Sequence, residues 1–211
     1  EGLSALAIFV AAIIMWITES LPMCVTTFVF MALIPYFGIM ELSEVWTSFG
    51  GSSFFFVIAT FAITMAISKT SIPLRISYKL LQWSKGNSTK LILGFMFACA
   101  ITSAIMSNLS TCILYLGLVM ALLKANHCEP GKSNLGKCLM ITIPAAAGIG
   151  GLITPAGTPG NVMVLDMLAN AGITVTFLQW TLIFAPLALI TVFICGIWIT
   201  RIFKPEPITA E

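Results

Sequence analysis

The hydrophobic pattern of this chain consists of long apolar runs separated by short polar or basic steps. Most of these runs suit helices that cross or enter a membrane, for which a full span takes about 20 apolar residues. The segment at about 72–84 instead mixes apolar residues with Arg75 and Lys79, which predicts an amphipathic helix on the cytoplasmic membrane surface. The other predicted elements are helices at about 3–18, 23–40 and 49–69, a hairpin at about 90–124, a broken helix at about 135–169 and a last helix at about 173–203.

The run from residue 91 to residue 123 contains no charged residue and no proline. As one straight helix it would be about 50 Å long, against a hydrocarbon core of about 30 Å. Ser107 and Asn108 interrupt it near its centre, and Lys90 and Lys124 flank its two ends. Because lysine favours the cytoplasmic side, both ends are expected there. The pattern therefore predicts a re-entrant helical hairpin that turns at Ser107 and Asn108, near the middle of the membrane.

The run from residue 138 to residue 165 is also uncharged, but its centre is rich in residues that break helices. Residues 148–161, GIGGLITPAGTPGN, contain two prolines and five glycines. Proline removes a helical hydrogen bond and glycine weakens a helix, so this segment cannot be one continuous helix. We expect an unwound stretch over 155–160 between two helical halves. Unwound backbone at membrane depth is tolerated only where it is buried in protein or lines a wet cavity.

Composition and charge indicate a multi-pass protein of the cell membrane, either plasma or inner. Hydrophobic residues make up 59% of the chain and charged residues 9%, whereas soluble domains carry about 25% charged residues. The ten lysines and arginines fall in three clusters, at 69–90, 124–137 and 201–204. A re-entrant hairpin puts all three on one side of the membrane, whereas a single crossing would separate the first two. The six cysteines lack metal-ligand spacing and are interpreted as packing residues.

Two interrupted helices that meet within a membrane indicate the ion and substrate site of a secondary transporter. The oxygens of Ser103, Ser107 and Asn108, together with unwound backbone carbonyls, can replace the water around a sodium ion. The half-helix that begins after Ser107 offers free N–H groups and a positive dipole end to a carboxylate. Residues 91–123 and 138–165 contain no Asp, Glu, Lys, Arg or His, so neutral oxygens favour sodium coupling over a proton relay.

With these features the chain resembles the amino-terminal inverted repeat of the divalent anion sodium symporter family, the sodium-coupled carriers of dicarboxylates, citrate and sulfate. The matching features are Ser103 with the Ser107-Asn108 tip, the stretch GGLITPAGTPGN at 150–161, and the opening pattern WITESLP at 16–22. The resemblance covers nearly the whole chain. It implies an all-α membrane protein, a polytopic helical bundle that forms a single repeat of an inverted-repeat transporter.

The resemblance also implies roles for individual residues. The sodium site would comprise Ser103, Ser107, Asn108 and the Gly157 carbonyl, and the substrate site Asn108, Thr158 and the position of Leu109. Two positions depart from the family pattern. Leu109 replaces the threonine of a Ser-Asn-Thr tip, which removes a hydroxyl expected to touch a substrate carboxylate, and Gly160 replaces a usual second proline. These departures affect the choice of substrate more than the fold.

The favoured interpretation is half of a secondary active transporter for sodium-coupled uptake or exchange of small divalent anions, such as the C4-dicarboxylates succinate, malate and tartrate. The alternatives are a related carrier of citrate, sulfate or arsenite, and a membrane scaffold fragment that does not transport. An intramembrane serine protease would need a base at membrane depth, and the only histidine, His127, lies in a polar loop. We therefore expect no enzyme activity.

The expected partners are a small anionic substrate, the lipid bilayer, a second inverted repeat and, in the full-length protein, a second copy in a homodimer. We expect no nucleic-acid partner and no cofactor beyond sodium as the coupling ion. The chain begins with Glu1 instead of methionine and ends near a linker-like Pro205-Glu206-Pro207, which suggests a piece of a longer protein. Such a piece would hold half of a site and would not transport alone.

Overall fold

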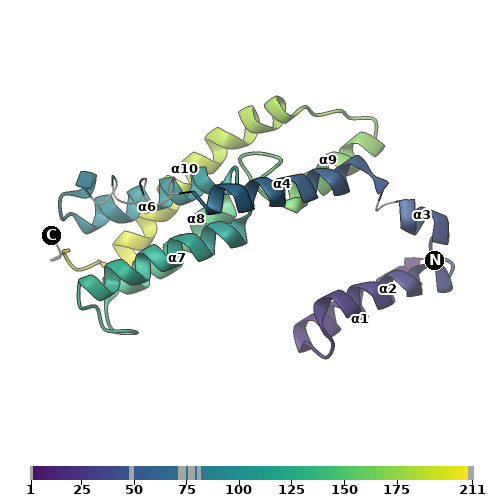
Figure 1. The fold of residues 1–211 in the computed structure, drawn as a ribbon, viewed down its shortest axis with the longest axis horizontal. Coiled ribbons are helices and arrows are strands. Elements are labelled where there is room, and N and C mark those ends of the chain that lie inside the picture. The colour runs from purple at the N-terminus through teal and green to yellow at the C-terminus, as the bar shows by residue number, and fades with distance from the viewer. Residues whose placement is uncertain (1, 48–49, 71–74, 76–78, 80–81, 209–211) are drawn as a thin grey trace. The chain divides into compact units, whose positions relative to one another are not determined.

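The computed structural model describes residues 2–47, 50–70, 75, 79 and 82–208, and every regular element in that part of the chain is a helix (Figure 1). This confirms the predicted all-α class. The chain divides into two compact units, Glu1–Phe55 and Phe56–Glu211. The helices are α1 (Gly2–Thr18), α2 (Met23–Tyr36), α3 (Leu42–Thr47), α4 (Ser52–Ser68), α6 (Ser88–Ser103), α7 (Asn108–Ala125), α8 (Asn134–Gly150), α9 (Pro159–Asn170) and α10 (Phe177–Phe203).

The first unit contains α1 packed on α2, followed by the short helix α3. α2 ends at Tyr36, earlier than the pattern suggested, because Gly38 adopts a φ of 66° and closes the helix with a left-handed turn. The Ile39 N–H accordingly donates to the Ile34 carbonyl at 3.1 Å. α3 lies between the helices predicted at 23–40 and 49–69, where no element was predicted, and it buries Val45.

The core of the second unit is formed by α6, α8 and α10, with α7 packed on α8. Several of its large side chains are fully buried, including Leu91, Ile92, Met96, Tyr115 and Leu139. α6 and α8 pack closely at Gly150, where an added Cβ would collide with the backbone of Ala100. Only glycine allows the two helix backbones to approach so closely.

The first interruption lies between α6 and α7, at residues 104–107. Ser107 caps α7, since its hydroxyl accepts a 3.3 Å hydrogen bond from the Ser110 N–H. The two helices pack against each other, with the Tyr115 hydroxyl 3.0 Å from the Thr102 hydroxyl. The chain therefore reverses direction at the polar residues singled out in the sequence. Entry of this pair into the membrane from one face stays a prediction.

The second interruption lies between α8 and α9, at residues 151–158. α9 begins at Pro159, which suits the first helical position because proline has no N–H to leave unpaired. The indole N–H of Trp180, in α10, donates to the Leu152 carbonyl at 3.0 Å and ties the start of this stretch to the neighbouring helix. The non-helical stretch thus begins slightly earlier than the prediction of 155–160.

Residues 204–208, which we call the C-terminal strap, bind the starts of two core helices. The Glu206 carboxylate accepts hydrogen bonds from the Asn134 N–H at 2.9 Å, the Leu135 N–H at 2.8 Å and the Ser133 hydroxyl at 3.0 Å, which caps α8. The Ser88 hydroxyl, at the start of α6, donates to the Glu206 carbonyl. The three hydrogen bonds to its carboxylate, with that from the Asn134 N–H as the largest cause, lower the pKa of Glu206 from 4.5 to about 2.

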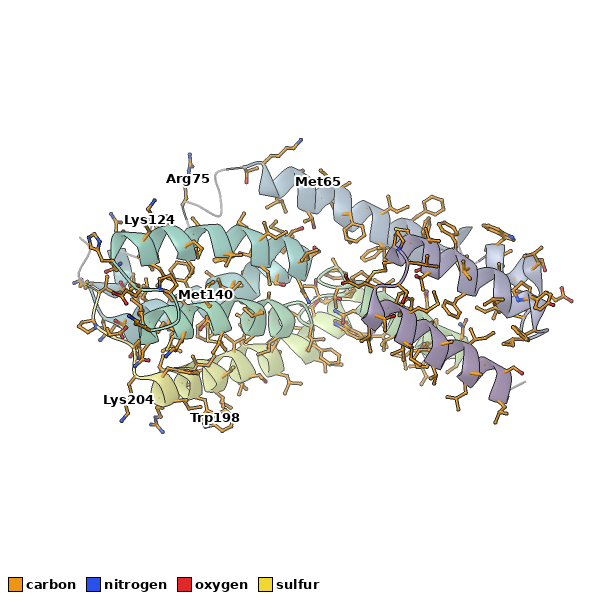
Figure 2. The ribbon with its side chains drawn as sticks, turned by 90° about the horizontal axis from the view of Figure 1, so that it is seen from below. Met65, Arg75, Lys124, Met140, Trp198 and Lys204 are labelled. Carbon is orange, nitrogen blue, oxygen red and sulfur yellow. The ribbon has the colours of Figure 1, made fainter. Side chains whose placement is uncertain are left out.

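Large apolar side chains cover much of the exterior of both units. In the described residues, α7 and α10 are long and apolar enough to cross a membrane, and α1, α2, α6 and most of α4 are shorter apolar helices. Lys124, in the last turn of α7, and Lys204, just after α10, lie at the same end of the second unit (Figure 2). Most of the surface helix predicted at 72–84 falls on 72–74, 76–78 and 80–81, which lie outside the described residues.

Candidate ion and substrate site

The two interruptions meet at Asn108, the first residue of α7. The hydroxyl of Ser103, at the end of α6, lies 2.8 Å from the Asn108 side-chain amide and donates to the Ala147 carbonyl at 2.8 Å. The Gly157 carbonyl, in the second interruption, completes the group at 3.3 Å from the amide. We call Ser103, Asn108, Ala147 and Gly157 the Asn108 cluster. Ser103 and Ala147 are completely buried.

The Asn108 amide has two orientations with different chemical meanings. Either one puts a heavy atom at the same point, 2.8 Å from Ser103 Oγ, 3.1 Å from the Ala147 oxygen and 3.3 Å from the Gly157 oxygen. With nitrogen at that point, the two N–H groups of the amide are shared among these three oxygens. With oxygen there, four oxygens converge, which is the set of ligands that a hard cation takes up. In the first orientation the cluster is a closed hydrogen-bonded group. Rotation of the Asn108 amide would turn it into a group of oxygen atoms that can accept a cation.

Two glycines make this approach possible. A Cβ added to Gly151 would overlap the Asn108 amide, and a Cβ added to Gly157 would overlap the Gly151 carbonyl. Neither glycine has a positive φ, so the requirement is for space and not for backbone conformation. The glycine-rich motif of the sequence thus brings backbone oxygens to within reach of a side chain on another helix.

The non-helical stretch 151–158 is held by side chains whose role the sequence did not reveal. The Asn161 amide, 4% exposed, donates to the carbonyls of Gly151 and Thr154, both at 2.8 Å. The Thr154 hydroxyl donates to the Ala104 carbonyl in the other interruption. Asn161 stood at the end of the recognised motif, but only its position in space shows that it satisfies unwound carbonyls.

The other predicted site residues lie outside this hydrogen-bonded cluster. The Ser107 hydroxyl caps α7 and contacts the Ser110 hydroxyl at 3.2 Å, while the Ser107 N–H donates to the hydroxyl of Thr64 in α4 at 3.3 Å. Leu109 is 71% exposed. Thr158 is half-buried at the start of α9, and its hydroxyl makes no capping hydrogen bond.

The electrostatics of this region come from neutral groups. Among the described residues, no three His, Cys, Asp or Glu side chains gather into a possible metal site. Two helices, α7 and α9, begin close together, at Asn108 and Pro159. The Asn108 side-chain amide, at the start of α7, lies 3.3 Å from the carbonyl oxygen of Gly157, which comes two residues before α9. A helix N-terminus carries a partial positive charge, which favours an anion, although Pro159 itself contributes no N–H to the start of α9. The region therefore combines oxygens for a cation with dipole ends for an anion.

Comparison with known proteins gives two kinds of match. A family model described as citrate transporter matches residues 13–210. The chain is 26% identical over 220 residues to the sodium-dependent dicarboxylate transporter SdcS of Staphylococcus saprophyticus, covering 98% of this chain and 42% of that protein. It is 25% identical over 198 residues to the protein of the same name from Staphylococcus aureus, covering 90% and 38%. The chain thus spans about two fifths of the length of these relatives.

Proposed function

This chain belongs to the citrate transporter family, and we propose that it forms half of a secondary carrier for sodium-coupled uptake or exchange of small divalent anions. Its membership and its dicarboxylate-transporter relatives confirm the resemblance found in the sequence, and it is a multi-pass protein of the cell membrane. The observation that carries the proposal is the Asn108 cluster, in which two interrupted helices bring neutral oxygens together. C4-dicarboxylates such as succinate, malate and tartrate are the proposed substrates.

The proposed sodium ligands are Ser103, Ser107, Asn108 and the Gly157 carbonyl. Three of these meet at a point where turning one amide leaves only oxygen atoms, which fits a small hard cation. The relatives are named sodium-dependent transporters, which supports the same ion here. Ser107 is the fourth proposed ligand. Its hydroxyl accepts a hydrogen bond from the Ser110 N–H in this structure and would have to give up that bond to reach the ion.

The proposed substrate groups are the starts of α7 and α9, with Asn108, Leu109 and Thr158. Two adjacent helix N-termini suit the two carboxylates of a short dicarboxylate. The Thr158 hydroxyl is not engaged in capping α9, so it can meet a carboxylate. The Leu109 side chain offers no hydrogen bond. We expect this residue to be the main reason why the cargo would differ from that of family members with threonine here. Citrate, sulfate and arsenite are the alternative cargoes.

A second inverted repeat is proposed to complete the site, and the full-length protein is proposed to be a homodimer. The chain covers only 42% of its relative in Staphylococcus saprophyticus, which leaves room for a repeat of similar size.

α6 and α7, with 16 and 18 residues, are about 24 and 27 Å long, close to the thickness of the hydrocarbon core. We expect both to tilt, which would bring the re-entrant tip back toward the membrane centre.

Uptake of labelled succinate by proteoliposomes containing the full-length protein tests this function. We expect uptake that falls to background when choline replaces sodium. Ser103→Ala should raise the sodium concentration for half-maximal uptake about tenfold, since it removes one ligand of a charged group. Thr191→Ala, which changes a hydroxyl bonded to its own helix on α10, serves as the matched control.

Three results separate the alternatives. Succinate uptake that is equally fast in choline would reject sodium coupling. Uptake of citrate, sulfate or arsenite in preference to succinate would change the cargo and keep the ion site. Vesicles that contain residues 1–211 alone should show no uptake, and uptake there would reject the proposal that the site needs a second repeat.

A further inference from the structure

A groove of about 740 Å³ lies between the end of α7 and the start of α8, on the second unit. The loop that joins the two helices forms its third side. Its walls are largely apolar side chains, contributed by Met120, Ala121, Leu123, Cys128, Pro130 and Met140. Met120 and Met140 are 53% and 40% exposed, so the groove opens outward.

Two lysines also line this groove. Lys124 comes from the last turn of α7 and Lys137 from the first turns of α8, and both are exposed. Glu129 also borders the groove, but its carboxylate is paired with Lys132 at 2.7 Å. The charge that the groove presents is therefore the two positive charges of Lys124 and Lys137.

The groove lies at the end of the second unit that carries the basic residues. Lys124, on its edge, is at the same end as Lys204 (Figure 2). Basic residues of membrane proteins concentrate on the cytoplasmic side, where the leaflet contains anionic lipids. An apolar groove lined by two lysines at this end of the unit matches a molecule with a long apolar chain and an anionic head.

We propose that this groove binds one anionic phospholipid, with an acyl chain against Met120, Ala121 and Met140 and the phosphate between Lys124 and Lys137. Charge complementarity favours this occupant over a zwitterionic lipid, whose headgroup carries no net charge to balance the two ammonium groups. A lipid held here would fill the space between the second helix of the hairpin and the first half of the broken helix. The inference concerns a face remote from the Asn108 cluster and does not depend on which substrate is carried.

Native mass spectrometry of the full-length protein in mild detergent tests the proposal with phosphatidylglycerol and phosphatidylcholine. We expect phosphatidylglycerol adducts to dominate, and the double variant Lys124→Gln/Lys137→Gln to weaken them about tenfold. Ala121→Trp, which fills the groove and keeps both lysines, should weaken them similarly. Arg201→Gln/Lys204→Gln removes the same charge at the same end of the unit and should leave them within about twofold.

Several outcomes would overturn the proposal. Equal retention of the two lipids, or adducts unaffected by Lys124→Gln/Lys137→Gln, would reject a specific anionic site. Full retention in Ala121→Trp would show that only a headgroup adsorbs to the surface. Phosphatidylglycerol that fails to bind because another part of the protein or a second copy covers the groove would also reject it.

A measurement on the unaltered protein guards against variants that misfold. Cys128 lines the groove and is partly exposed. Modification of this thiol by a soluble maleimide, quantified by peptide mass spectrometry, should be slowed by phosphatidylglycerol and not by phosphatidylcholine. Modification of Cys24, in the first unit, is the internal control. Equal slowing by both lipids would contradict the proposed selectivity.

Discussion

The side-chain nitrogen of Asn161 lies 2.8 Å from the carbonyl oxygen of Gly151 and also 2.8 Å from that of Thr154. One amide therefore donates to two carbonyls of the interrupted helix, and the Thr154 carbonyl also accepts a hydrogen bond from the Gly157 N–H at 3.2 Å. This matters because an unpaired backbone group at membrane depth is costly. Gly151 also lies against the Asn108 amide. By binding the Gly151 carbonyl, Asn161 therefore holds in place the backbone that the candidate ion site packs on.

Replacing Asn161 with alanine should destabilise the protein and weaken sodium activation. The Gly151 carbonyl would lose its side-chain donor, at a cost of about 1–3 kcal/mol before relaxation, while the Thr154 carbonyl would keep the hydrogen bond from the Gly157 N–H. Thermal unfolding in detergent and the sodium dependence of uptake measure the two effects. Asn170→Ala, at the exposed end of α9, should change neither. An unchanged melting temperature in Asn161→Ala would contradict the support that we assign to this amide.

Gly151→Ala should abolish transport while leaving most of the fold intact. The added Cβ would overlap the Asn108 amide and push it out of the cluster, and such overpacking costs about 1–3 kcal/mol. Gly148→Ala is the matched control, because it lies in α8 with nothing within 4 Å of its Cβ position. That control should be neutral or stabilise by up to about 1 kcal/mol. Normal uptake by Gly151→Ala would refute the close approach.

Two threonines, Thr154 and Thr142, should respond in opposite ways to replacement by valine. The Thr154 hydroxyl donates to the Ala104 carbonyl, so its removal should cost about 1–3 kcal/mol. The buried Thr142 hydroxyl makes no hydrogen bond in the part of the chain described, so its removal should be neutral or stabilise by about 1 kcal/mol. Melting temperatures of the two variants in the same detergent check this. Equal losses would show that Thr142 does have a partner in the full-length protein.

The pH dependence of stability should reveal the C-terminal strap. The folded-state pKa of Glu206, about 2, lies below its ordinary 4.5, so its contribution is present above about pH 4.5 and is lost as the pH falls toward 2. Because Glu206 is exposed, we expect the contribution to be no more than about 1 kcal/mol.

Glu206→Gln should therefore lower the melting temperature slightly at pH 7 and remove the difference from the unaltered protein near pH 2. Glu129→Gln breaks an exposed ion pair and should have a smaller effect at pH 7. A difference between Glu206→Gln and the unaltered protein that does not shrink with acid would contradict the lowered pKa.

The two helix interruptions could be predicted because their causes are local. Ser107 is a capping residue inside an apolar run, and residues 148–161 concentrate proline and glycine. The family resemblance implied a site of Ser103, Ser107, Asn108 and Gly157; the structure brings Ser103, Asn108 and Gly157 into one hydrogen-bonded group without the Ser107 hydroxyl. Their role as sodium ligands stays a prediction.

What the sequence did not reveal depends on contacts between distant residues. Thr64 meets Ser107, and Glu206 caps a helix that begins 72 residues earlier in the chain. Neither contact leaves a periodic signal, since one polar side chain in an apolar helix or a terminal segment looks like many others. The early end of α2 depended on Gly38 taking a left-handed conformation, which a sequence permits without requiring.

At Gly150 and Ala100 the backbones of α8 and α6 meet with no side chain between them. Because packed interfaces do not deform continuously, we expect α6 and α8 to keep this contact when the protein changes conformation. The helices α6 and α8 would then move together as one rigid body. Any swing that exposes the Asn108 cluster to one side of the membrane and then to the other would have its hinges elsewhere in the molecule.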